Sequence, residues 1–242
     1  MKPVFAAIAF GLHLMASAGM PTDSIIWTKP TVRGKVITTG SEIHYAGDLD
    51  AVVAKSIVSL IGQQTFDTLI IQSAGGDQVA ARKIGTAVFD HQMTVVVSGQ
   101  CSSSCARYIF VAAKRKLIEP DSFVMFSEHQ SYHDYVQGIV QLSEKRGMPG
   151  VARLSDRETA MLIAGEKWVE LETKYFTKIG VDMRITSFGY LPGRPVSHWL
   201  MTGKRMAEFG VLNVTLPENY GTQEYCDKMK LAGFVRFDAQ CL

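Results

Sequence analysis

Residues 68–76 read TLIIQSAGG, a short apolar run that ends in two small residues and a pair of glycines. A continuous apolar run of this length is typical of a strand buried on both faces, as the strands of parallel sheets are. Residues 94–99, TVVVSG, repeat the arrangement after a segment long enough for one helix. Strands that alternate with helices at this spacing indicate β-α-β crossovers. The sequence therefore predicts an α/β fold with a mainly parallel sheet.

The chain on either side of these runs predicts further elements of the same fold. Gly99 is expected to end the second run, and Asp48 or Asp50 to cap the helix before the first run. Ser155 and Glu158 form a capping box before a long amphipathic helix. The expected elements are strands at residues 36–37, 43–45, 117–118 and 123–126, helices at about 48–61, 77–89, 101–111 and 156–179, and a loop at 181–198.

The two ends of the chain differ in character from this central region. Residues 1–18 begin with a basic residue, continue as an apolar stretch and end in Ala-Ser-Ala, the pattern of a secretory signal peptide cleaved after Ala18. The alternative is an ordinary buried N-terminal helix. Residues 19–214 are expected to form one domain, and residues 215–242 a tail held by a disulfide.

The four cysteines, Cys101, Cys105, Cys226 and Cys241, all follow the predicted signal peptide. Export would place them where disulfides persist. Four cysteines allow three pairings, and we favour Cys101 with Cys105 and Cys226 with Cys241 because each pair is local. The alternative is a zinc site, but the spacings are not of the short knuckle type and no histidine lies near either pair. No metal is therefore expected.

Small and polar residues cluster where two of the predicted parallel strands end. Residues 73–77 and 99–105 lie at these ends, which is where open α/β sheets place their ligands. SAGG followed by a helix in the first segment, and CSSSC in the second, resemble the paired motifs of the Clp protease proteolytic subunit, a member of the crotonase superfamily. The similarity covers roughly residues 36–126 and, more weakly, 199–214. It implies a crotonase-like or Clp-protease-like β-α-β superhelix with a C-terminal helical segment, and the Cys-x-Ser-x-Cys form is similar to predicted periplasmic bacterial members.

The resemblance implies roles for residues in both segments. It places Ser103 at the nucleophile position of a serine peptidase. It places the backbone N–H groups of Gly76 and Ser104 in the oxyanion hole, with Ser73 and Gly75 in the same substrate-binding loop. Two preorganised donors aimed at a developing oxyanion lower the reaction barrier substantially. The alternative is that Ser103 is only a small residue that lets the next helix pack.

The sequence departs from the family at the general base and at the acid. The resemblance expects a histidine where this chain has Ser127 and an acidic residue where it has Ser197. A serine cannot act as a general base at neutral pH. The substitutes considered are His129, which on a continuing strand would face the same side as Ser127; Lys145, as in the Ser-Lys dyads of similar bacterial signal peptide peptidases; and His198. The alternatives are that His129 lies in an exposed loop and Lys145 at a solvated helix end.

Two functions follow from the motif and its missing partners. The first is an exported, Clp-protease-like pseudopeptidase that binds a peptide or protein with little or no catalysis. The second is an active serine endopeptidase that uses Ser103 with His129 or Lys145 as a non-standard base. No cofactor is expected, and a crotonase-type acyl-CoA enzyme is less favoured because export would separate it from its cofactor.

The expected partners are peptides or proteins. Lys and Arg number 25 against 23 Asp and Glu, and no basic run alternates with aromatic residues, so a nucleic-acid partner is not expected. The resemblance also implies a homo-oligomer, with the contact expected on the helix at 156–179 around Trp168 and Tyr175.

Overall fold

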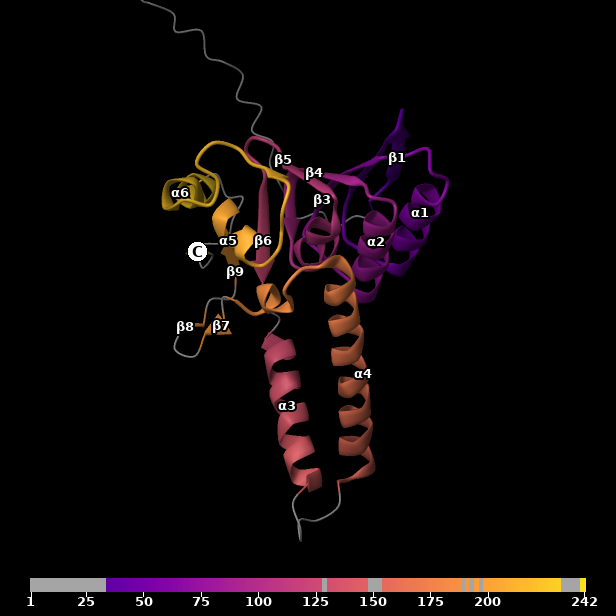
Figure 1. The fold of residues 1–242 in the computed structure, drawn as a ribbon, viewed down its shortest axis with the longest axis vertical. Helices are drawn as coiled ribbons and strands as arrows, with labels where there is room; N and C mark the ends of the chain where they lie inside the picture. Colours follow the sequence, from indigo (N-terminus) through magenta and orange to yellow (C-terminus); the bar gives the residue numbers. More distant parts are fainter. Residues whose placement is uncertain are drawn as a thin grey trace, which may run out of the picture.

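The structure of the protein is a computed structural model, and it describes residues 34–127, 130–147, 154–188, 190–191, 194–195, 198–231 and 240–242. The predicted signal peptide, His129 and Ser197 lie outside these residues. Within them the chain forms one large sheet covered by helices, and a pair of long helices that runs away from the sheet (Figure 1).

Nine strands of the described chain form the large sheet in the order β1-β2-β3-β4-β6-β9-β11, with β5 and β10 on a branch from β4. Strands β2, β3, β4 and β6 pair in parallel, whereas β1 and β9 pair antiparallel with β2 and β6. The predicted α/β class with a mainly parallel sheet is confirmed. The strands are β1 (Val36–Thr39), β2 (Glu42–Ala46), β3 (Thr68–Ser73), β4 (Thr94–Ser102), β5 (Arg115–Ile118), β6 (Phe123–Ser127), β9 (His198–Leu200), β10 (Val214–Thr215) and β11 (Gln240–Cys241).

Strand β4 lies at the branch of the sheet. Its first half pairs with β5, and its second half, residues 100–102, pairs with β6. The expectations that Gly99 ends this strand and that a helix begins at Cys101 are wrong. The strand continues because the Ser122 hydroxyl accepts the Gly99 N–H at 2.7 Å and because residues 100–102 find a parallel partner in β6. The turn into the next helix therefore comes at Ser103.

Two capped helices and a π-helix pack against the sheet. Helix α1 (Ala51–Ile61) starts after Asp50, one of the two predicted caps, whose carboxylate accepts the N–H groups of Val52 and Val53 at 2.8 Å. Helix α2 (Gln78–Asp90) starts after Asp77 in the same way. The π-helix (Cys105–Phe110) is buried along its whole length and contacts α2, β4 and β6. The segment that follows Ser103 is thus fixed between the sheet and α2.

Two long helices, α3 (Gln130–Gly147) and α4 (Asp156–Ile179), lie side by side and extend away from the sheet (Figure 1). Ser155 and Glu158 form the predicted capping box of α4, and Gly180 ends this helix in the left-handed region at φ 70°. Helix α3 is not among the predicted elements, because its apolar positions are interrupted by Gly138 and surrounded by polar residues.

The segment after α4 contains more regular structure than the predicted loop. It forms a short 3-10 helix (Met183–Thr186) and strands β7 (Tyr190–Leu191) and β8 (Arg194–Pro195), and its last residue, His198, begins β9. Strand β9 is followed by α5 (Gly203–Glu208), in the region where the resemblance implies a C-terminal helical segment, and by α6 (Gln223–Leu231). None of the helices in the described ranges is both long and apolar enough to cross a membrane.

Both favoured disulfides are confirmed. Cys101 in β4 bonds to Cys105 in the π-helix with Cα atoms 5.2 Å apart, and Cys226 in α6 bonds to Cys241 in β11 with Cα atoms 6.1 Å apart. Since all four cysteines are in disulfides, the zinc alternative is wrong. The second disulfide links α6 to β11, and β11 pairs in parallel with β9 of the sheet.

Candidate active site

Ser103 occupies a strained turn between β4 and the π-helix. Its φ of 54° lies in the left-handed region, which costs a residue with a side chain about 1–3 kcal/mol. The turn is held on both sides, because the Ser103 N–H donates to the Met125 carbonyl at 3.0 Å and the Ser103 carbonyl accepts the Arg107 N–H at 2.9 Å. This is the strand-to-helix turn that the sequence predicts for a nucleophile.

The loop after β3 packs directly against this turn. Gly75 has φ 104°, and a Cβ atom placed on it would lie 2.8 Å from the Ser102 carbonyl oxygen and 3.1 Å from the Ser104 nitrogen. The buried Ser73 hydroxyl accepts the Gly75 N–H at 3.1 Å. The Ser104 hydroxyl donates to the Gly76 carbonyl at 3.1 Å. The structure therefore brings together the predicted loop and the predicted nucleophile.

Two backbone N–H groups beside Ser103 have no acceptor within the described part of the chain. The Leu49 N–H donates to the Gly75 carbonyl, and the Leu49 carbonyl accepts the Asp77 N–H, each at 2.8 Å. The Gly76 N–H, between these two bonds, takes no part in the pairing. Among the described residues, neither the Gly76 N–H nor the Ser104 N–H donates a hydrogen bond. A pair of unengaged N–H groups next to a serine hydroxyl can bind a carbonyl oxygen and the oxyanion formed from it.

The position where the resemblance expects a histidine lies next to the turn. Ser127 is the last residue of β6 and is 7% exposed. Its carbonyl accepts a hydrogen bond from the buried guanidinium of Arg107, which is one helical turn beyond Ser103. On the other side of β6, His198 is the first residue of β9 and pairs with Ser127. The ends of three neighbouring strands thus meet at Ser103, Ser127 and His198.

The two predicted substitute bases are not seen near Ser103. His129 lies outside the described residues, and the strand that was expected to carry it ends at Ser127, with α3 beginning at Gln130. Lys145 is in the last turn of α3, with a side chain 54% exposed and its Nζ 3.7 Å from a Glu158 carboxylate oxygen. A lysine needs burial to lose its charge and act as a base, and these surroundings do not supply it. Both assignments stay untested predictions.

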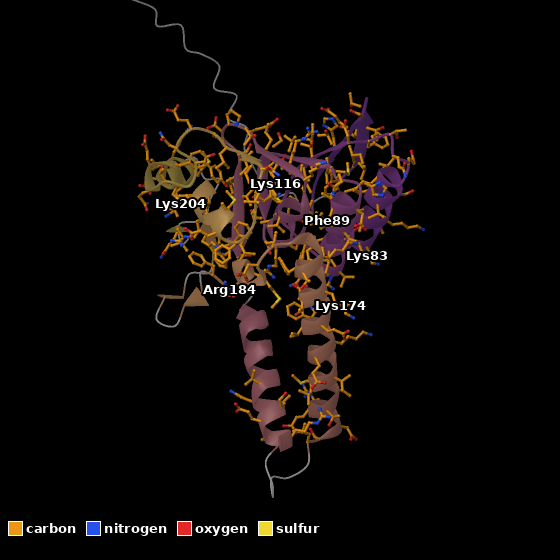
Figure 2. All side chains as sticks on the ribbon, in the orientation of Figure 1. Lys83, Phe89, Lys116, Lys174, Arg184 and Lys204 are labelled. Atoms are coloured by element: carbon orange, nitrogen blue, oxygen red, sulfur yellow. A yellow bond between two sulfur atoms is a disulfide. The ribbon has the colours of Figure 1, made fainter. Side chains whose placement is uncertain are left out.

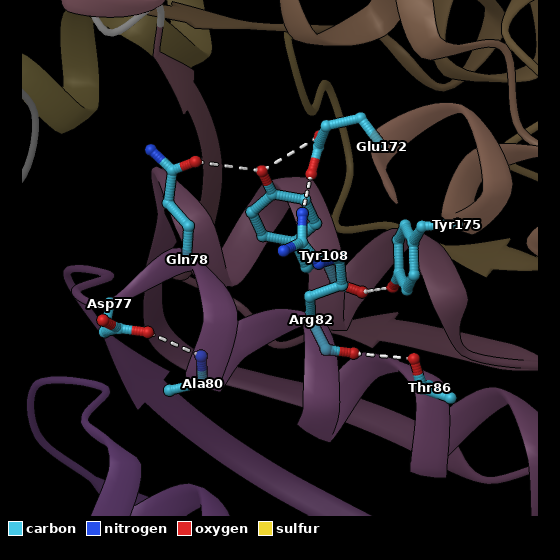
Figure 3. Close-up of polar contacts among 8 residues, drawn as sticks. All are labelled: Asp77, Gln78, Ala80, Arg82, Thr86, Tyr108, Glu172 and Tyr175. Carbon is cyan, nitrogen blue, oxygen red and sulfur yellow. Dashed lines mark hydrogen bonds and ion pairs between the residues drawn. The ribbon is translucent and has the colours of Figure 1, made fainter. Parts of the chain in front are cut away.

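A buried polar cluster, which sequence reasoning missed, joins α4 to the π-helix (Figure 3). The Glu172 carboxylate of α4 pairs with the Arg82 guanidinium of α2 and accepts a hydrogen bond from the Tyr108 hydroxyl at 3.1 Å. The Gln78 side chain lies 3.2 Å from the same hydroxyl, and the Tyr175 hydroxyl donates to the Tyr108 carbonyl. The one sequence signal was a glutamate on the inward face of the long helix. We refer to these five residues as the Glu172 cluster.

Burial dominates the electrostatics of this cluster. It raises the pKa of the Glu172 carboxyl above its usual range, although the Arg82 guanidinium and the Tyr108 hydroxyl act in the opposite direction. It also raises the pKa of the Tyr108 hydroxyl, so this group stays a neutral hydrogen-bond donor at physiological pH. The cluster therefore fixes the π-helix that follows the Ser103 turn, rather than supplying a reactive group.

A large groove lies away from Ser103. It has a volume of about 1050 Å³ and runs between α1, α2 and α4. Lys55, Lys83 and Lys174 line it, together with apolar residues that include Val79 and Leu171; Figure 2 labels two of these lysines. None of the residues at the Ser103 turn lines this groove. In the described chain no group of three or more His, Cys, Asp or Glu side chains could hold a metal ion.

The comparisons with known proteins add a distant structural likeness. No protein-family model matches the sequence, and no curated protein matches it. Among solved structures, a mutant of ClpP1 from Listeria monocytogenes is similar, with a TM-score of 0.45 and 15% sequence identity. The likeness covers 74% of this chain and 92% of that chain. The fold and the site together define an α/β protein with a serine at a strand-to-helix turn that faces a glycine loop.

Proposed function

We propose that this protein is an exported, serine-peptidase-like hydrolase that binds an extended peptide or protein segment at Ser103 and transfers its acyl group to the Ser103 hydroxyl. The observation that carries the proposal is the pair of Gly76 and Ser104 N–H groups beside Ser103, neither of which donates a hydrogen bond within the described residues. The strained backbone of Ser103 supports it as well, because strain of this kind persists where the surrounding structure holds it and often marks a functional residue.

The chemistry follows from the arrangement of these groups. The Ser103 oxygen attacks the carbonyl carbon of a peptide bond while its proton passes to a base. The carbonyl π electrons move onto the oxygen, and the two N–H groups stabilise the resulting oxyanion. Collapse of this intermediate breaks the C–N bond as the base returns the proton to the leaving amine. Water then hydrolyses the acyl-serine, which restores the Ser103 hydroxyl. No cofactor takes part in these steps.

Export is part of the proposal. The disulfides Cys101–Cys105 and Cys226–Cys241 support it, because disulfides persist in oxidising compartments such as the bacterial periplasm and the extracellular space. The signal-peptide pattern of residues 1–18 supports the same location.

A second function, peptide binding without catalysis, is favoured by one observation. Ser127 stands at the base position that the resemblance implies, and a serine hydroxyl does not remove a proton at neutral pH. The glycine loop and the two N–H donors would still bind the backbone of an extended peptide.

A fluorophosphonate serine-hydrolase probe, added to the purified, disulfide-bonded protein, separates the two functions. An activated Ser103 is expected to react covalently, with the modified residue identified by mass spectrometry. Ser103→Ala is expected to abolish the labelling. Ser102→Ala is the matched control, since it removes the neighbouring hydroxyl, and it is expected to label like the unchanged protein.

The opposite result has a clear meaning. If the folded protein with both disulfides intact does not react with the probe, the hydrolase is wrong. The peptide-binding function then predicts that a peptide library still binds and that Gly76→Ala weakens this binding.

A further inference from the structure

The register of β6 and β9 places one histidine in the row of strand ends that contains Ser103. Ser127 and His198 are directly opposite each other in this antiparallel pair. Directly opposed residues point to the same face of a sheet, with Cβ atoms about 4.5–5.5 Å apart. His198 is therefore the cross-strand neighbour of the very position at which the resemblance expects a base.

Ser127 in turn lies between the Ser103 turn and β9. The Ser103 N–H bonds to Met125, two residues before Ser127, and the Arg107 guanidinium reaches from the helix after Ser103 to the Ser127 carbonyl. The order across the sheet is β4, β6, β9, so Ser103 and His198 are separated by two strand spacings, or about 10 Å between backbones.

The side chains available at these positions suit this separation. His198 is half-buried, and an imidazole extends far enough to cover much of a single strand spacing. Ser127 is the one residue between them, and its side chain is small and carries a hydroxyl that both donates and accepts. A serine at position 127 thus places a hydroxyl on the strand between Ser103 and His198.

We propose that His198 is the general base for Ser103 and that the Ser127 hydroxyl lies between them as a proton relay. The proposal rests on the hydrolase function proposed above. In this proposal the imidazole is on β9, next to the strand where the resemblance expects it. One histidine and one hydroxyl thus replace the base and the acid that the motif lacks.

The proton balance of the step is simple. As the Ser103 oxygen forms its bond to the substrate carbonyl carbon, its proton passes to the Ser127 oxygen, and the Ser127 proton passes to a ring nitrogen of His198. The imidazolium carries the positive charge while the oxyanion is bound. When the C–N bond breaks, the same path returns a proton to the leaving amine, and His198 becomes neutral again.

The test measures the rate of probe labelling of Ser103 in the disulfide-bonded protein. His198→Ala is expected to lower this rate by about 100-fold or more, the usual contribution of a general base. Added imidazole is expected to restore part of the rate, because a free base can enter the space that the side chain leaves. Ser127→Ala is expected to lower the rate as well, since it breaks the relay without removing the base.

Two variants serve as controls. His44→Ala removes a histidine of β2 that pairs with Glu42, far along the sheet from β9, and is expected to leave the rate unchanged. Lys55→Ala, which removes an exposed lysine of α1, is expected to do the same. Near-ultraviolet circular dichroism and intact disulfides are required of every variant.

The outcomes separate this proposal from the hydrolase proposal. If the unchanged protein reacts and His198→Ala reacts equally fast, the role of His198 is wrong while the hydrolase stands. If His198→Ala is slow and imidazole restores nothing, His198 has a structural role and the proposal is overturned. If the unchanged protein does not react at all, the hydrolase itself is wrong, and the proposal for His198 is wrong with it.

Discussion

Gly76 is a residue whose side chain is excluded by its surroundings. Its φ of 141° is unfavourable for other residues, and a Cβ atom on it would lie 2.3 Å from the Leu49 carbonyl oxygen and 2.7 Å from the Leu49 nitrogen. Both neighbours are backbone atoms held in hydrogen bonds, so neither can move cheaply. Only a glycine at position 76 therefore fits the backbone conformation that places the Gly76 N–H, the group we propose to bind the substrate carbonyl.

Gly76→Ala is therefore expected to lower the free energy of unfolding by more than about 1 kcal/mol and to abolish labelling of Ser103. Urea unfolding and the labelling assay measure the two effects. Gly138→Ala is the matched control. Gly138 lies within α3 with open space around it, so an alanine there is expected to raise helix stability by up to about 1 kcal/mol. Equal effects of the two substitutions would contradict the role of the Gly76 backbone.

Ser102, next to Ser103, is expected to behave in the opposite way to Gly76. It is 4% exposed, and its hydroxyl finds no partner among the described residues. Burying an unpaired hydroxyl costs about 1–3 kcal/mol, so its removal offsets the small loss of packing. Ser102→Ala is expected to keep or slightly raise the urea midpoint. A loss of 2 kcal/mol, roughly what a broken hydrogen bond leaves behind, would show instead that this hydroxyl has a partner.

At the scale of helices and strands, the Glu172 cluster holds α4 against α2 and the π-helix. Glu172 has a side chain 3% exposed, and that of Arg82 is 12% exposed. Removing one partner of a buried pair costs several kcal/mol, because the other charge is left without compensation. The cluster therefore determines where α4 meets the sheet, and with it the position of the helix that follows Ser103.

The raised pKa of Glu172 predicts a pH dependence of stability. The folded protein holds a proton on Glu172 at pH values where the unfolded chain has already lost it, so the free energy of unfolding falls as pH rises from the usual 4.5 through the raised pKa. Glu172→Gln is expected to remove this fall, as measured by urea unfolding at a series of pH values. In contrast, the exposed Glu170 hydrogen-bonds Lys174, which lowers its pKa, so Glu170→Gln should leave the fall in place. A fall of the same size in Glu172→Gln would rule out this residue as its source.

The elements also show which signals are local in the sequence. The cap at Asp50 and the box of Ser155 with Glu158 could be predicted because the groups that bond lie within three residues of each other. Strand β9 could not, because it is three residues long and exists only through pairing with β6 and β11. The closeness of Ser103 to the glycine loop could be predicted, because both follow consecutive parallel strands. The pairing of Ser127 with His198 could not, because it joins strands that are far apart in the sequence.

The Cys226–Cys241 disulfide in the tail is expected to support the pairing of β9, which carries His198, because it holds β11 beside β9. Cys226 and Cys241 are 15 residues apart, and closing a loop of that size stabilises a protein by about 3 kcal/mol in the chain-entropy model. The double variant Cys226→Ser/Cys241→Ser is expected to lower Tm and to release β11 from β9, and so to slow labelling of Ser103 through His198. Calorimetry and the labelling assay test this. If Tm falls while labelling is unchanged, β9 holds His198 in place without β11.

For the whole molecule, the unusual feature is the pair α3 and α4, which projects from the sheet beyond the other helices (Figure 1). The contact between copies was expected around Tyr175, but this residue is 5% exposed and bonds within the Glu172 cluster, so it is not available. Leu171 of α4 is 41% exposed, and three more exposed apolar residues lie further along the pair: Val140 is 44%, Met161 48% and Ile163 58% exposed. The projecting pair thus carries several apolar side chains that the described chain leaves exposed.

We therefore expect these helices to join copies of the chain, and light scattering at micromolar concentration to give a mass above that of the monomer. Ile163→Glu is expected to lower this mass, because a contact between identical copies buries the new charge at least twice and repels like charges. Leu231→Glu is the matched control, since Leu231 is an 88% exposed leucine on α6, away from this pair. A monomeric mass for the unchanged protein would overturn the oligomer. A loss of mass in both variants would not assign the contact to α3 and α4.

The Glu172 cluster links α4 to the helix after Ser103. An oligomer formed through α3 and α4 would therefore also restrain the geometry at Ser103. A dissociating Ile163→Glu variant should then label more slowly than the Leu231→Glu control.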